Sequence, residues 1–101
     1  MAKKLAPVHP GEILREEFLA PVQLSPYAVA RACGVPRTRI ERLAREATSV
    51  TADTALRLAR YFGTTPAFWM GIQAQHDLER AEDEGAKDLR WIAPHKRDAA
   101  A

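Results

Sequence analysis

Two short amphipathic segments joined by one glycine constrain the fold of this chain more than any other feature. In the first, Ser25 precedes "PYAVARACG", so a capping serine is followed by proline at the first helical position. Gly34 can take a left-handed backbone conformation without steric cost, and the small Ala30 lets a second helix approach closely. Apolar residues stand where the two helices would meet: Val29, Cys33, Val35, Ile40 and Leu43. The set predicts a helix-turn-helix over Pro26 to Arg45, and an αα-corner without a DNA role is the alternative.

Capping residues and apolar spacing predict three more helices. Residues 11–22 carry an apolar stripe that Pro21 ends, Thr51 caps residues 52–62 ahead of Gly63, and Thr65 with Pro66 starts a longer amphipathic helix. Their apolar positions are Ile13, Leu14, Phe18 and Leu19, then Ala55, Leu56, Leu58, Ala59 and Phe62, then Phe68, Trp69, Ile72 and Leu78. No segment alternates with period two, so no sheet is expected.

The expected architecture is therefore all-α, with five helices and a short C-terminal tail that is irregular or forms a strand. We expect one domain over residues 1–85, including a dimerisation helix, and a charged tail over 86–101. A length of 101 residues suits a single core, and 47% hydrophobic with 28% charged residues is typical of globular chains. The absence of a long apolar run and the lone cysteine favour a cytoplasmic protein.

Charge is polarised along the chain. Seven basic against three acidic residues between Ser25 and Arg60 give a balance of +4, whereas Pro66 to Asp88 has a balance of −4. This predicts two different partners or two different faces.

The arginines of the second helix of the helix-turn-helix are the candidates for DNA contact. At about 100° per residue, a wheel centred on Ile40 places Leu43, Ala44 and Ala47 toward the core. Arg37, Thr38 and Arg39 at the start of the helix are the base-reading candidates, because that end enters the major groove. Arg42 and Arg45 lie further along the helix and could contact either bases or phosphates. Ser25 and Tyr27 are candidates for phosphate contacts. The alternative is that Ser25 only caps its helix and Tyr27 only packs. Arg57 and Arg60 are expected to be solvated.

The final helix carries two candidate interaction surfaces. Its apolar cluster, Phe68, Trp69, Met70 and Ile72, either closes the core or forms a dimer interface, and one helix can do both. The acidic patch, Glu79, Glu82, Asp83 and Glu84, either attracts a basic protein or is a solvated helix end.

Catalytic and metal-binding patterns are lacking. His9, His76 and His95 have no ligand spacing with one another or with Cys33, and no phosphate loop or nucleophile motif occurs. We expect no enzyme activity, no cofactor and no metal, with a structural role for His9.

The segments "HPGEILREEFL", "VARACGVPRTRI", "TADTALRLARYFGTTPAFWM" and "IQAQHDLERA" together resemble a HigA-type antitoxin, a branch of the XRE-type (lambda-repressor-like) helix-turn-helix proteins. The resemblance covers roughly His9 to Ala81. It implies a homodimer that binds double-stranded operator DNA, represses its own operon and neutralises a HigB-type toxin that cleaves mRNA.

The sequence departs from that family in three places. Pro26 and Pro36 replace polar residues that begin the two helices of the motif, and Arg45-Glu46 replaces a common asparagine-glycine pair. Two other functions stay open: a stand-alone XRE-type repressor without a toxin, and a protein-interaction module that no longer binds DNA.

Overall fold

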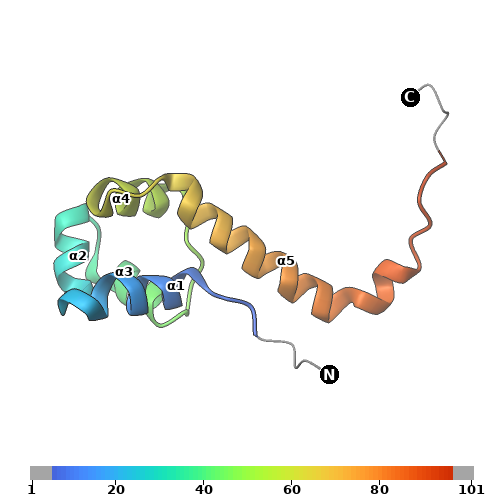
Figure 1. Ribbon diagram of the computed structural model, residues 1–101, viewed down its shortest axis with the longest axis horizontal. Coiled ribbons are helices and arrows are strands. Elements are labelled where there is room, and N and C mark those ends of the chain that lie inside the picture. Colours follow the sequence, from blue (N-terminus) through green and yellow to red (C-terminus); the bar gives the residue numbers. More distant parts are fainter. Residues whose placement is uncertain (1–5, 97–101) are drawn as a thin grey trace.

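The computed structural model describes residues 6–96, which contain five α-helices and no strand (Figure 1). They are α1 (Pro10–Ile13), α2 (Pro26–Cys33), α3 (Arg37–Ala44), α4 (Ala52–Phe62) and α5 (Pro66–Arg90). The first four gather at one end of the molecule, and α5 extends away from them (Figure 1). The all-α, five-helix prediction is confirmed, and no helix among these residues is long and apolar enough to cross a membrane.

The first predicted helix continues beyond α1 with altered winding. A π-helical segment, η1 (Leu14–Leu19), follows α1, and a 3-10 turn, η2 (Ala20–Val22), completes it. Ala20 donates its N–H to the carbonyl of Arg15, five residues back. In an α-helix the ring of Pro21 would clash with the carbonyl four residues earlier, and wider winding ahead of it avoids that clash. The helix thus passes through Pro21, where the sequence predicted its end.

Helix boundaries follow the predicted caps. The hydroxyls of Ser25, Thr51 and Thr65 each accept the backbone N–H three residues later, at 3.1, 3.3 and 3.1 Å. Gly34 and Gly63 follow α2 and α4 in the left-handed conformation, with φ of 70° and 75°. These end groups satisfy backbone donors and acceptors that the helices themselves leave unpaired.

One core joins all the helices. Its fully buried side chains come from every part of the fold: Leu14, Val29, Ile40, Leu43, Leu58 and Trp69. Two predicted core positions are wrong, because Ala47 and Leu56 are exposed, and the apolar position Leu78 is exposed as well. Ala47 lies beyond the end of α3, Leu56 faces away on α4, and Leu78 lies on α5 past its last buried residue, Gln73.

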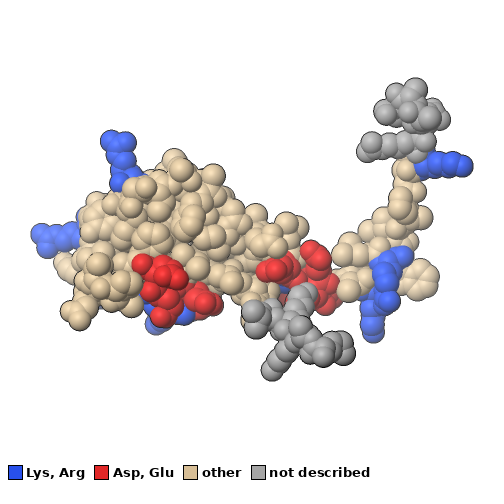
Figure 2. Space-filling view, viewed as in Figure 1, with Lys and Arg blue, Asp and Glu red and all other residues tan. Residues whose placement is uncertain are grey.

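The long helix α5 is only partly covered. Trp69 and Gln73 are its buried residues, and the Gln73 side-chain carbonyl accepts the Val50 N–H at 2.7 Å. Beyond Gln73 the helix continues to Arg90, five residues past the expected domain boundary at residue 85, and residues 92–96 are irregular. Acidic side chains lie over the middle of α5 on the face that Figure 2 shows.

Candidate nucleic-acid interface

The helix α3 presents one apolar and one basic face. Its buried residues are Ile40, Leu43 and Ala44, as the wheel predicts. Exposed residues of and directly after α3 are Arg37, Thr38, Arg39, Arg42 and Arg45. All five therefore lie on the surface together, on a helix whose other side is anchored in the core. This geometry suits a helix that enters a DNA groove.

The arginines of this surface differ in their partners. Arg37 lies 3.5 Å from the carboxylate of Glu41, one turn along the same helix, and Arg39 lies 2.6 Å from the carboxylate of Asp53 on α4. Within residues 6–96, neither Arg42 nor Arg45 makes an ion pair. Those two guanidinium groups keep all their donors for a ligand.

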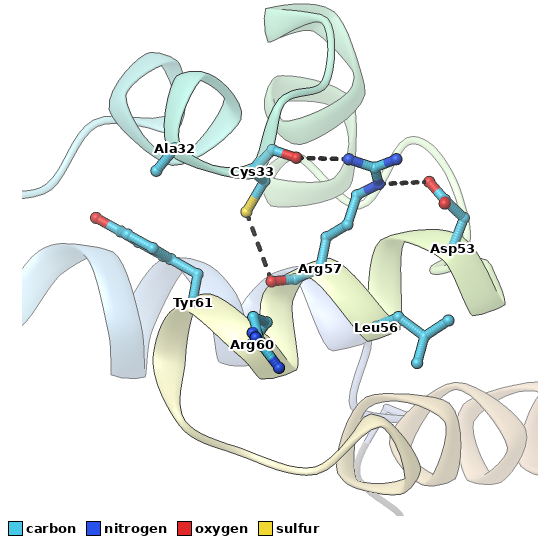
Figure 3. Close-up of a pocket in the computed structure, with 7 residues that line it drawn as sticks. All are labelled: Ala32, Cys33, Asp53, Leu56, Arg57, Arg60 and Tyr61. Carbon is cyan, nitrogen blue, oxygen red and sulfur yellow. Dashed lines mark hydrogen bonds and ion pairs between the residues drawn. The ribbon is translucent and has the colours of Figure 1, made fainter.

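The carboxylate of Asp53 also accepts a hydrogen bond from a second arginine. Arg57 on the same helix donates to it from Nε at 3.0 Å and to the Cys33 carbonyl from Nη1 at 2.7 Å (Figure 3). Hydrogen bonds from Arg39 first, and then from Arg57, lower the pKa of Asp53. Arg57 is exposed, as expected, and it also ties α4 to the end of α2. The contact between Arg57 and the Cys33 carbonyl could not be predicted from local spacing, because the two residues are 24 positions apart.

The end of α3 is held by the first helix. Arg15 Nη1 donates to the carbonyl of Ala44 at 2.5 Å, and Nη2 lies 3.1 Å from the carboxylate of Glu46. Glu46 has a φ of 64°, the left-handed conformation that the glycine of an asparagine-glycine pair would adopt without cost. Arg15 therefore satisfies a terminal carbonyl of α3 and pairs with the residue that ends it. This role of Arg15 has no local signal in the sequence, because Ala44 lies 29 positions away.

The backbone of α1 lies directly against the same end of α3. A Cβ atom added to Gly11 would lie 1.8 Å from the Leu43 carbonyl oxygen. Only glycine allows this approach. The position and tilt of α3 therefore depend on a glycine in the first helix.

The start of α2 contributes two predicted phosphate contacts. Ser25 caps the helix through its Oγ, and Pro26 occupies the first helical position. Tyr27 is 53% exposed, so about half of the residue is open to solvent. Pro36 serves as the N-terminal cap of α3 without a side-chain hydrogen bond, so it offers no polar group to a ligand.

The buried His9 caps α1. Its Nδ1 accepts the Gly11 N–H at 2.9 Å, and its ring meets that of His76 edge to face with centroids 4.9 Å apart. Burial, followed by the proximity of His76, lowers the pKa of His9 from its ordinary value of 6.5. Glu46 and Asp77 oppose that shift and Arg15 adds to it. The structural role predicted for His9 is confirmed.

The free energy of unfolding should therefore fall as the pH drops below 6.5. Above that value His9 is neutral in both states, whereas below it the unfolded chain takes up a proton that the folded chain resists, which costs up to about 1.4 kcal/mol per pH unit. Urea unfolding at pH 7.5 and 5.5 measures the loss. His9→Asn keeps a cap acceptor without titrating, so its loss should be smaller than that of the wild type. Equal losses would contradict this assignment.

The four residues of the predicted dimerisation cluster differ in their burial. Trp69 is fully buried and packs against Phe18, with ring centroids 5.2 Å apart, which is the core-closing alternative for this residue. Phe68 and Met70 are 40% and 38% exposed, and Ile72 is half-buried. These three, without Trp69, remain on the surface of α5.

Residues 14–69 match the sequence pattern of the helix-turn-helix family. Virulence-associated protein I of Dichelobacter nodosus is 47% identical over 91% of this chain and 84% of its own length. Antitoxin HigA-1 of Vibrio cholerae is 35% identical over 90% of this chain and 86% of its own. The structure of Pseudomonas aeruginosa antitoxin HigA with the higBA promoter superposes with a TM-score of 0.85, at 42% identity over 89% of this chain and 99% of that one. This chain therefore belongs to the HigA-type antitoxins of the XRE-type helix-turn-helix family, which is not an enzyme family.

Proposed function

We propose that this protein is a cytoplasmic antitoxin that binds operator DNA as a dimer, represses its own operon and neutralises a HigB-type toxin. The observation that carries the DNA-binding part is the exposed arginine face of α3, held on a core by its opposite side. Similarity to an antitoxin whose structure includes promoter DNA supports the same conclusion. The stand-alone repressor shares this DNA-binding step and differs only in lacking a toxin.

Base reading is assigned to Arg37, Thr38 and Arg39, because they occupy the first turn of α3, the part of a recognition helix that enters the major groove. Arg42 follows one turn later on the exposed side, and Arg45 directly after the helix. Ser25 and Tyr27 at the start of α2 position a phosphate. Neither Pro26 nor Pro36 takes part, since neither has a donor.

Replacing Arg37 or Arg42 with alanine should each cost about 1–3 kcal/mol in the preference for operator over unrelated DNA. Fluorescence anisotropy with the DNA upstream of the gene, repeated across salt, measures the affinity and the salt slope. Each lost phosphate contact should reduce that slope by about one. Arg60→Ala removes the same charge from exposed α4 and is the matched control. If Arg60→Ala weakens binding as much as Arg42→Ala, the assignment of DNA contact to the exposed face of α3 is wrong.

Dimerisation is assigned to the outer face of α5. Phe68, Ile13 and Ile72 line a groove of about 520 Å³ there, with Val8 and Gly71 beside them. Two-fold dimers place two recognition helices roughly 34 Å apart, one DNA turn. We assign Phe68 and Ile72, which share this face, to the contact between the two copies. Met70 points to another side of α5, so it would take part only at the edge of that contact. Phe68→Glu should yield a monomer by sedimentation. Because the Phe68 ring also lies against Trp69, circular dichroism checks that the variant is folded, and a folded variant that stays dimeric would contradict the assignment.

The acidic patch, Glu79, Glu82, Asp83 and Glu84, is assigned to the toxin. Glu82, Asp83 and Glu84 lie on the part of α5 that extends away from the first four helices. Glu79 is half-buried and also lines the groove beside Ile13 and Phe68. A toxin that cleaves mRNA has to contact phosphates through basic residues, and opposite charge favours association of a basic protein with this patch. Co-expression with the neighbouring small reading frame tests this: a toxic, co-purifying product supports the antitoxin, whereas a harmless product that does not bind favours the stand-alone repressor.

A further inference from the structure

The carboxylate of Asp53 connects the recognition helix to the rest of the motif. We propose that Asp53 is a positioning residue for DNA recognition, which holds the guanidinium of Arg39 in a fixed orientation at the start of α3. This inference rests on the proposed DNA-binding function and adds to it a specificity-determining residue on α4.

Asp53 is anchored independently of Arg39. Arg57, one turn later on α4, donates from Nε to Asp53 Oδ2 at 3.0 Å, and its Nη1 donates to the Cys33 carbonyl at 2.7 Å (Figure 3). Asp53 also stands in the first turn of α4, where the helix dipole favours a negative charge. The carboxylate is therefore fixed by its own helix and, through Arg57, by the end of α2.

Arg39 is the arginine of α3 that is tied to another helix. Its Nη1 lies 2.6 Å from Asp53 Oδ2, whereas the 3.5 Å contact of Arg37 is to Glu41 within α3. A guanidinium has five N–H donors, and this contact uses one of them. The Arg39 side chain is 41% exposed, so the remaining donors are accessible in the first turn of the recognition helix. An arginine already held in place loses less conformational entropy when it binds.

A carboxylate at this position has two opposite effects on DNA binding. Its negative charge repels phosphates and weakens binding to any sequence. Its hold on Arg39 restricts that side chain to one geometry, which favours DNA whose bases match it. Replacing a residue that matters only for folding would instead weaken binding to every DNA sequence alike.

The variant Asp53→Asn separates the effect of the negative charge from the effect of holding Arg39. We expect tighter binding to an unrelated duplex, a salt slope on that duplex steeper by about one, and a preference for the upstream DNA reduced about tenfold. The side chain of Asp53 is 54% exposed, so the variant should keep its fold, which thermal melting checks. Glu41→Gln is the matched control, since it removes the same charge from beside Arg37 and leaves Arg39 paired. It should keep the preference.

The same measurement in the Arg39→Ala background completes the test. If Asp53 acts through Arg39, adding Asp53→Asn to Arg39→Ala should change the preference by less than about twofold. A wild-type protein without preference for the upstream DNA overturns the proposed function and this inference with it. A wild-type preference that Asp53→Asn leaves intact overturns the role of Asp53 alone. Equal weakening on both duplexes, together with a lower melting temperature, also overturns it, because that result indicates a structural role.

Discussion

Trp69→Ala should lower the free energy of unfolding by about 3–5 kcal/mol. Trp69 is fully buried, its ring lies against Phe18 and Phe68, and its Nε1 donates to Thr64 Oγ1 at 2.8 Å. Alanine would leave a cavity where α5 meets the first helix, and it would remove that hydrogen bond. Small domains have about 5–15 kcal/mol of stability in total, so much of the fold would be lost.

The second tryptophan provides the matched control for this prediction. Trp91 is 85% exposed, so Trp91→Ala should change the free energy of unfolding by no more than about 0.5 kcal/mol. Urea unfolding followed by circular dichroism, at one protein concentration, compares the variants. Similar losses for both tryptophans would show that Trp69 is not the residue that joins α5 to the core.

Gly11→Ala should destabilise the protein by about 1–3 kcal/mol or more, although alanine is the better helix former. The added Cβ would lie 1.8 Å from the Leu43 carbonyl oxygen, and this oxygen belongs to backbone that cannot rotate away. The first helix would have to move off the end of α3. Because that contact sets the tilt of the recognition helix, the preference for operator DNA should fall as well.

Gly85→Ala gives the opposite expectation at a helical glycine of α5. A Cβ there would meet nothing within 4 Å, so the substitution should stabilise the protein by up to about 1 kcal/mol. Thermal and urea unfolding of both variants measure whether each one raises or lowers the free energy of unfolding. A neutral or stabilising effect of Gly11→Ala would contradict the close approach of α1 and α3.

The local features of the fold could be predicted from sequence because their causes are local. Ser25, Thr51 and Thr65 cap helices through donors three residues away, and Gly34 and Gly63 end them through their own backbone freedom. The buried side of α3 followed from helical spacing alone. Each of these depends on neighbours within about one turn.

Contacts between distant segments could not be predicted in this way. Arg15 reaches Ala44, and Arg39 reaches Asp53, across 29 and 14 positions of the chain. The exposure of Leu56 could not be predicted either, because an apolar residue on a helix does not show which side of that helix packs against the core. The candidate interface was therefore located from sequence, whereas the residues that hold its arginines in place needed the structure.

The claim that DNA lies on the exposed face of α3 can be tested residue by residue. Backbone amide NMR spectra, recorded as the upstream duplex is added to the ¹⁵N-labelled protein, report which segments contact it. The largest shift changes are expected over residues 37–45 and at the start of α2, with little change over residues 78–90 of α5. Changes concentrated in α5, or a duplex that leaves α3 unperturbed, would contradict the assignment.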